Sequence, residues 1–176
     1  MRVLHSYIRF VDRLNERIGF FVSWITSILV LVVCLDVFTR YFLKKSSVAA
    51  QELEWHLFAI IFLIGAAYTL KHDRHVRVDV FYTKFKTPLK EWIDFLGSLI
   101  FLIPFSILII WSSKNFVINS FLIGEVSPDP GGLPARYLLK ACIPIGFFLV
   151  LLQGFAQFFK SLLSLQKADA AGENDQ

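Results

Sequence analysis

Long runs of apolar residues alternate with short polar connections along this chain. Four segments contain no Asp, Glu, Lys or Arg: 18–35, 55–70, 95–113 and 141–159. They hold 18, 16, 19 and 19 residues, whereas a hydrocarbon core of about 30 Å needs about 20 helical residues at 1.5 Å each. The pattern therefore predicts four membrane-spanning helices. The short second run indicates that its helix begins earlier, near residues 49–52.

Short connections between four apolar runs favour an antiparallel helical bundle in one domain. We expect spans at about 18–43, 50–70, 92–114 and 136–160, inside a transmembrane domain of residues 18–165. The polar end KADAAGENDQ predicts a flexible tail over 166–176. Hydrophobic residues make up 56% of the chain and the mean hydropathy is +0.59, well above a soluble domain. The fold class is thus an all-α membrane protein with four transmembrane helices.

The first twenty residues, MRVLHSYIRFVDRLNERIGF, combine apolar positions at helical spacing with arginines on the rest of the helical wheel. The apolar positions are Leu4, Ile8, Val11, Leu14 and Ile18. This pattern predicts an amphipathic helix over residues 1–17 that lies in the membrane surface, and a flexible basic tail is the alternative. The following apolar run is longer than that of a signal peptide and no A-x-A-like site follows it, so we expect it to be retained.

Basic residues are distributed unequally between the two sides of the predicted bundle. The polar segments on the side of the N-terminus hold twelve of the eighteen Lys and Arg residues. The positive-inside rule therefore predicts that both termini are cytoplasmic. Anionic lipid headgroups are a sufficient partner for the net charge of +4, so no nucleic acid is expected.

Four polar residues at the outer ends of the first two spans predict an ion network. Asp36 and Arg40 are four positions apart, as are Glu52 and His56, so each pair shares a helical face. Because a short connection joins the two spans, we expect all four residues at similar depth in one network. A site for a transported ion is the alternative, but no carboxylate falls in the middle of a span. Glu54 points about 200° away from Glu52, toward the surface or another protein.

This sequence contains few residues that could bind a cofactor or a metal ion. Both cysteines, Cys34 and Cys142, lie in apolar spans, where packing is their usual role. Of four histidines, only His56 adjoins a span interior, so a pair of haem ligands on facing helices is not expected. A weak zinc pattern in the inner loop consists of His72, His75 and Asp73 or Asp79. We predict no cofactor, no metal and no catalytic site.

The outer connection between the third and fourth spans has an unusual composition. The segment GEVSPDPGGLPARY contains three prolines and a Gly-Gly pair, which restrict it to turns and extended backbone. Such a stiff polar loop serves either as a connector or as a docking surface for a partner, and the residues leave both open.

Several stretches are similar to one family of membrane proteins. An arginine closes the first span in DVFTRYFL, acids open the second span in QELEWHLF, small residues end it in LIGAAYTL, and HVRVDVFY follows. With the four spans, these stretches resemble the small membrane subunit, of DctQ type, of tripartite ATP-independent periplasmic (TRAP) transporters. The resemblance covers about residues 18–159. Many relatives have two adjacent acids where this chain has Glu52 and Glu54, which leaves open which one fills the family role.

The resemblance implies a non-enzymatic scaffold in the bacterial inner membrane. In this family, a large permease subunit of DctM type carries solute and sodium, and a periplasmic solute-binding protein delivers an organic acid or similar solute. The candidate residues for the partner interface are Glu54, Gly65, Ala66, His75, Asp79 and Arg136. The alternative function is a membrane-anchor subunit that binds haem or quinone in a respiratory dehydrogenase.

Overall fold

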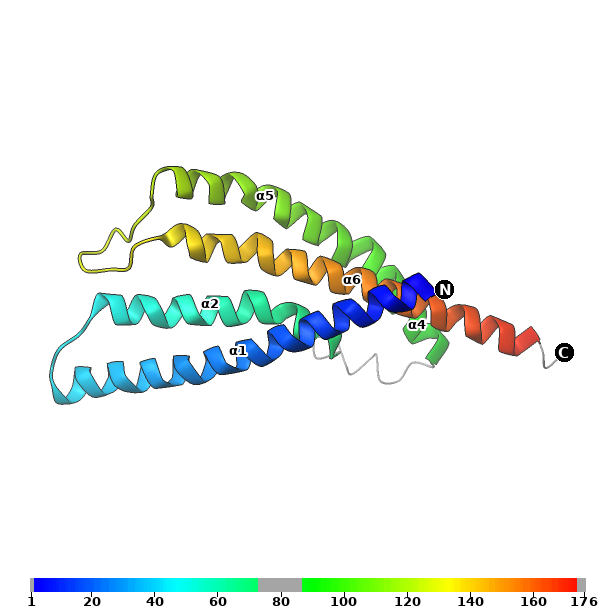
Figure 1. The fold of residues 1–176 in the computed structure, drawn as a ribbon, viewed down its shortest axis with the longest axis horizontal. Coiled ribbons are helices and arrows are strands. Elements are labelled where there is room, and N and C mark those ends of the chain that lie inside the picture. The colour runs from blue at the N-terminus through cyan, green and yellow to red at the C-terminus, as the bar shows by residue number, and fades with distance from the viewer. Residues whose placement is uncertain (1, 73–86, 174–176) are drawn as a thin grey trace.

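A computed structural model of the chain describes residues 2–72 and 87–173, apart from the side chains of 87, 88, 91 and 166–173. The described part consists of helices joined by loops (Figure 1). The elements are α1 (Arg2–Phe42), α2 (Val48–Lys71), α4 (Thr87–Gly97), the π-helical segment η1 (Ser98–Leu102), α5 (Ile103–Leu122) and α6 (Arg136–Glu173).

Four helical stretches in the described residues are long and apolar enough to cross a membrane. They are Arg2–Phe42, Val48–Lys71, Trp92–Leu122 and Arg136–Leu165. The expected all-helical protein with four spans is confirmed. The third stretch is longer than the expected 92–114, because α5 continues past Lys114 to Leu122.

The helices run up and down, and α6 lies at the centre of the array. Figure 1 places the α1–α2 connection and the α5–α6 loop at one end, which we call the loop end. The start of α1 and the last part of α6 lie toward the opposite end, here called the terminal end. Because α6 packs against every other described element, it holds the α1–α2 hairpin and the third helix together.

The N-terminal segment is not a separate helix, since α1 is continuous from Arg2 to Phe42. The apolar side of its first half packs on α6, where Ile8 and Val11 are buried against Ala156. Packing within the chain thus accounts for the amphipathic pattern of residues 1–17. Their placement in the membrane surface stays a prediction.

Small residues let α2 approach both of its neighbours closely. Gly65 faces Val22 of α1, and a Cβ atom there would lie 3.4 Å from the Val22 side chain. Ala67 is buried with Leu149 and Val150 of α6 in the main apolar cluster. On α6, Gly146 lies directly against the backbone of Leu63, where any side chain would collide with the carbonyl group. These contacts keep α2 between α1 and α6.

The third membrane-crossing helix contains one π-helical turn. At its end the N–H of Ile103 donates to the carbonyl of Ser98, five residues back. The next residue, Pro104, has no N–H to donate and follows at the start of α5. Proline inside a helix removes a backbone hydrogen bond and crowds the preceding turn, and a π turn accommodates both effects.

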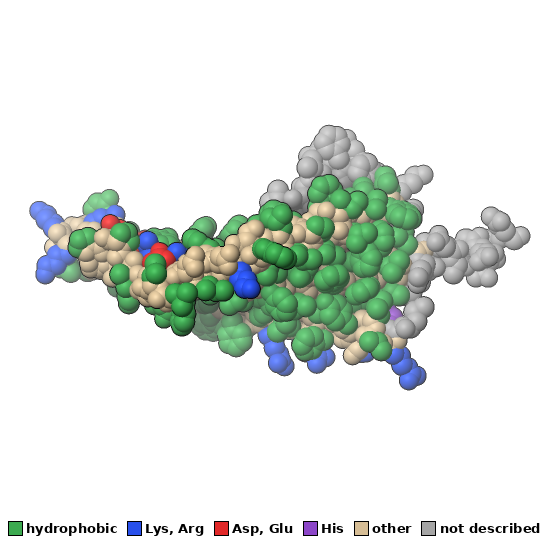
Figure 2. Space-filling view, turned by 90° about the horizontal axis from the view of Figure 1, so that it is seen from above, with side chains coloured by type: hydrophobic (Ala, Val, Ile, Leu, Met, Phe, Trp, Pro, Cys, Tyr) green, Lys and Arg blue, Asp and Glu red, His purple; other side chains and the backbone are tan. Residues whose placement is uncertain are grey.

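Most of the surface at the level of the spans is apolar. In the most hydrophobic 18-residue window of each span, only 6% to 28% of the residues are buried inside the chain. Figure 2 shows hydrophobic side chains over the wide part of one face, with the acidic side chains in view toward the narrow loop end. This surface is available to lipid and to other membrane proteins.

Candidate functional site

The loop end contains a buried carboxylate that organises the long connection between α5 and α6. Glu52 lies in the second turn of α2, a helix capped by Ser47, and only 4% of the residue is exposed. Its carboxylate accepts hydrogen bonds from the Ser127 hydroxyl and, at 2.6 Å, from the backbone N–H of Leu133. An Arg136 Nη atom lies 3.7 Å from the same carboxylate. We call these four residues the loop site.

The backbone of residues 123–135 folds tightly around this carboxylate. The Ser127 N–H donates to the Leu133 carbonyl at 3.1 Å, and the Gly132 N–H donates to the Asp129 carbonyl at 3.0 Å. A Cβ atom on Gly132 would lie 2.8 Å from a Glu52 oxygen and closer still to Ser127. Gly132 therefore meets a steric requirement, since it lets the loop backbone reach the acid.

The structure divides the four residues of the expected ion network into two groups. Asp36 is 3% exposed and pairs with Arg40 on the next turn of α1. The Glu52 carboxylate instead points to the α5–α6 loop, and the His56 ring nitrogen Nδ1 lies 2.5 Å from the Glu52 backbone carbonyl. The spacing of four positions predicted the contact of Asp36 with Arg40, whereas His56 contacts the backbone of Glu52 and not its carboxylate. The spacing could not show that a distant loop supplies the partners of Glu52.

A second ion pair fixes the other side of the same loop. Lys140 of α6 binds the carboxylate of Glu125, and its Nζ lies 4.1 Å from the centre of the Phe116 ring of α5. The hydrogen bond from Lys140 holds the pKa of Glu125 below its ordinary value of 4.5. The Arg136 N–H also donates to the Glu125 carbonyl at 3.0 Å. The loop is therefore tied to α2, α5 and α6.

A chain of polar side chains joins α1 to α6 at the terminal end. Lys160 binds Asp12 at 2.8 Å, Gln153 donates to Asp12 at 3.2 Å, and Asn15 donates to Gln153 at 2.7 Å. Because Asp12 can only accept, these contacts fix which way both amides point. Asn15 and Gln153 are buried almost completely. We call these four residues the polar cluster.

Glu16 ties α1 to the end of α2 beside the polar cluster. It pairs with Lys71, and a His72 ring nitrogen lies 3.1 Å from the same carboxylate oxygen. A small cavity of about 160 Å³ adjoins these contacts. Its lining residues are Leu70, Lys71, Asp94, Gln153, Gln157, Lys160 and Ser161. The charges of Asp12, Glu16, Lys71 and Lys160 thus serve helix–helix contacts.

The polar cluster was not predicted from the sequence. Two signals were present: Gln153 interrupts the uncharged run 141–159, and Asn15 lies on the same helical side as Ile8 and Val11. A polar residue on an apolar side indicates a polar partner on the facing helix, because an unpaired amide is costly there. The partner itself lies 138 positions away in the case of Asn15, beyond any local spacing rule.

The residues expected at a partner interface have different surroundings. Gly65 and Ala66 pack inside the chain against α1 and the α2–α6 cluster, and Arg136 belongs to the loop site. Glu54 is partly buried, and its Oε1 has no hydrogen-bond partner among the described residues. Two further candidates, His75 and Asp79, lie outside the described residues.

The described part of the chain contains no metal-binding cluster and no disulfide bond. Within residues 2–72 and 87–173, no group of three or more His, Cys, Asp or Glu side chains is arranged to hold a metal ion. Cys34 and Cys142 are free thiols. Chemically, the arrangement holds helices and one loop in place through paired charges at both ends.

These features define a helical, multi-pass membrane protein whose described polar sites connect its own elements. Residues 29–164 match the family described as tripartite ATP-independent periplasmic transporters, DctQ component. The match covers more than half of the chain, so the chain belongs to the DctQ family of TRAP transporter components. No curated protein matches it. The resemblance found in the sequence is confirmed.

Proposed function

We propose that this chain is the scaffold subunit of a TRAP transporter that supports the large permease subunit. The complex takes up an organic acid or similar solute, coupled to sodium, and a periplasmic binding protein delivers the solute. Membership of the DctQ family supports this assignment. The chain has a holding role and does not itself carry the solute.

The distribution of apolar and polar surface is the observation that carries the proposal. Few residues of the spans are buried inside the chain, whereas the acids of the loop site and the polar cluster are bound by groups of the same chain. Helices associate in lipid through close packing, since lipid gives no hydrophobic driving force. Such a surface suits stable contact with another membrane protein.

We propose that both termini are cytoplasmic and that the loop end faces the periplasm. Support comes from Figure 1, where the start of α1 and the end of α6 lie toward the same end. The larger share of basic residues belongs to the polar segments on that side. The loop site then lies on the side from which the binding protein approaches.

Glu54 is our candidate for a contact with the large subunit. It lies on the opposite side of α2 from Glu52, and one of its oxygens is buried without a described partner. Glu54→Lys should lower co-purification of the large subunit in mild detergent. Asp129→Lys, in the exposed part of the loop, is the matched charge reversal and should leave the yield unchanged. An unchanged yield for Glu54→Lys would remove Glu54 from this role.

Reconstitution tests the function as a whole. Proteoliposomes that contain this chain, the large subunit and the binding protein should take up solute when a sodium gradient is applied. Omission of this chain should abolish or strongly reduce uptake. Uptake by this chain alone, or a haem absorption band in the purified protein, would contradict the proposal.

A further inference from the structure

The first half of α1 carries a stripe of exposed arginines. Its buried side, formed by Ile8, Val11 and Asn15, packs against α6. At about 100° per residue, the four arginines fall within about 80° on the opposite side of the helix. These residues, which we call the arginine stripe, are Arg2, Arg9, Arg13 and Arg17, and all four are exposed.

The acids near the stripe are occupied by other cations. Asp12 is bound by Lys160, and Glu16 by Lys71 and His72. Within the described residues, no acidic side chain forms an ion pair with an arginine of the stripe. Arg9 donates to the backbone carbonyl of His5 at 3.2 Å, which leaves its charge uncompensated. The exposed side of this segment is therefore strongly basic.

Contacts with the other helices fix the depth of the stripe. Glu16 meets Lys71, which ends the apolar run 55–70, and Asp12 meets Lys160, which ends the run 141–159. Residues 12–17 thus lie at the border between hydrocarbon and headgroups. At 1.5 Å per residue, Arg9 lies about 5 Å beyond Asp12, within a headgroup layer about 5–8 Å thick.

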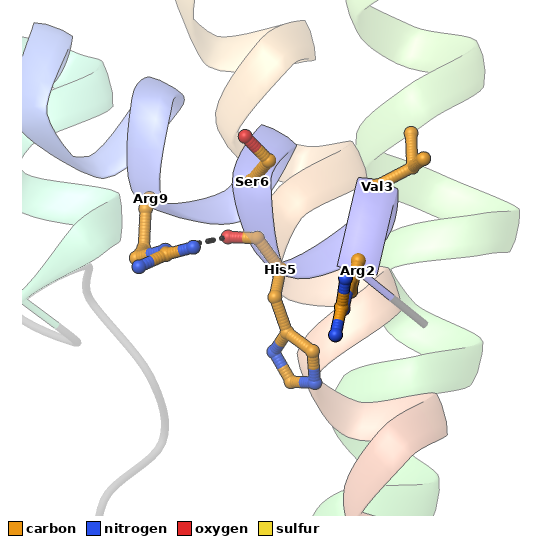
Figure 3. Close-up of a pocket in the computed structure, with 5 residues that line it drawn as sticks. All are labelled: Arg2, Val3, His5, Ser6 and Arg9. Atoms are coloured by element: carbon orange, nitrogen blue, oxygen red, sulfur yellow. Dashed lines mark hydrogen bonds between the residues drawn. The ribbon is translucent and has the colours of Figure 1, made fainter.

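Exposed apolar side chains lie next to the basic ones. Val3 is 81% and Phe10 is 65% exposed. Figure 3 shows a hollow lined by Arg2, Val3, His5, Ser6 and Arg9, with the side chains of Arg2 and His5 pointing to the same side. A surface that is basic along one edge and apolar along the next suits a membrane surface.

We infer that Arg9, Arg13 and Arg17 of the arginine stripe bind the anionic headgroups of phospholipids such as phosphatidylglycerol in the adjacent leaflet. A guanidinium group can donate two parallel hydrogen bonds to one phosphate, which gives specificity beyond simple charge attraction. The stripe lies before residue 29, where the family match begins. This binding is independent of the scaffold role.

The test compares two triple variants of the full chain, each of which removes three exposed charges. Arg9→Gln/Arg13→Gln/Arg17→Gln changes the stripe, and Lys44→Gln/Lys45→Gln/Lys114→Gln is the control toward the loop end. Each protein, purified in mild detergent, is titrated with phosphatidylglycerol and with phosphatidylcholine, and bound lipids are counted by native mass spectrometry. Circular dichroism checks that both variants stay helical. If the triple stripe variant fails to fold, the single variant Arg13→Gln is used in its place.

The unmodified chain should prefer phosphatidylglycerol. In the stripe variant, this preference should fall at least about fivefold, which is the effect of one basic side chain at an anionic surface. In the control variant it should fall less than about twofold. If both variants lost this preference equally, net charge alone would explain it, and the inference would be overturned. Unchanged lipid binding by the stripe variant, or displacement of the lipid by millimolar inorganic phosphate, would overturn it too.

Discussion

The backbone N–H of Leu133 donates a 2.6 Å hydrogen bond to the carboxylate of Glu52, 81 positions earlier in the chain. This bond holds the beginning of α2 to the loop between α5 and α6. The carboxylate also binds Ser127, so one acid organises two points of the loop. The geometry of the loop end therefore depends on a single side chain of α2.

Replacement of Glu52 should loosen the loop while the helices remain. Glu52→Gln keeps one oxygen but loses the charge that strengthens both hydrogen bonds. We expect amide hydrogen exchange at Leu133 to become at least about tenfold faster. Hydrogen exchange of residues 123–135, followed by mass spectrometry, measures this effect.

Glu54→Gln is the control for this experiment. It removes a charge from the same turn of α2, but no described hydrogen bond of Glu54 is lost. Exchange in the loop should stay as in the unmodified chain. If both variants accelerate exchange equally, the effect comes from the charge of α2 in general and the loop site is not its cause.

The close approach of α2 and α6 predicts a large effect of one methyl group. A Cβ atom at Gly146 would meet the Leu63 carbonyl group, 2.9 Å from its carbon atom. Because backbone cannot rotate away as a side chain can, Gly146→Ala should cost about 1–3 kcal/mol in free energy of unfolding. Thermal unfolding in detergent measures the loss. Gly97→Ala, where the added atom meets nothing within 4 Å, should leave stability unchanged or slightly higher.

The polar cluster predicts non-additive substitutions. Gln153→Leu leaves the buried amide of Asn15 without its partner, which should cost about 1–3 kcal/mol. Asn15→Leu/Gln153→Leu replaces both amides with apolar side chains and should recover part of this loss. A double-mutant cycle of unfolding free energies gives the coupling. Simple additivity of the two single effects would contradict a direct contact.

The ion pair between Glu125 and Lys140 predicts a pH dependence at acidic pH. Since the folded protein holds the pKa of Glu125 below 4.5, the stabilisation is present above that value and disappears as pH falls through the lowered pKa. The difference in unfolding temperature between the unmodified chain and Glu125→Gln should persist from pH 7 to about pH 5 and shrink below pH 4.5. Asp129→Asn in the same loop is the control. A difference that grows on acidification would contradict the prediction.

The number of spans could be predicted because it depends on the length of apolar runs alone. The runs 18–35 and 141–159 match the bilayer thickness without any knowledge of contacts. The continuity of α1 was not predicted, because the amphipathic pattern of its first half suits a membrane surface and a neighbouring helix equally well. Only the contact of Val11 with α6 identifies the neighbour.

The site could be predicted only where its contacts are local. Asp36 and Arg40 are four positions apart on one helix, and a spacing rule applies to them. The partners of Glu52 come from a loop, and Gly65 packs against its own chain because the α1–α2 hairpin closes on it. Such contacts depend on the topology of the helices, which the periodicity of a sequence does not specify.

The π-helical turn between α4 and α5 sets the rotational phase of the third span. In the view of Figure 1, α5 lies above α6 while α4 reaches below it, and both pack on α6. A π turn takes up about one residue more than an α turn, so the same residues in a regular α-helix would be rotated by about 100° before this point relative to α5. Phe95 would then turn away from its stacking partner Phe158. The π conformation of this five-residue segment thus decides on which flank of α6 the third span enters the membrane.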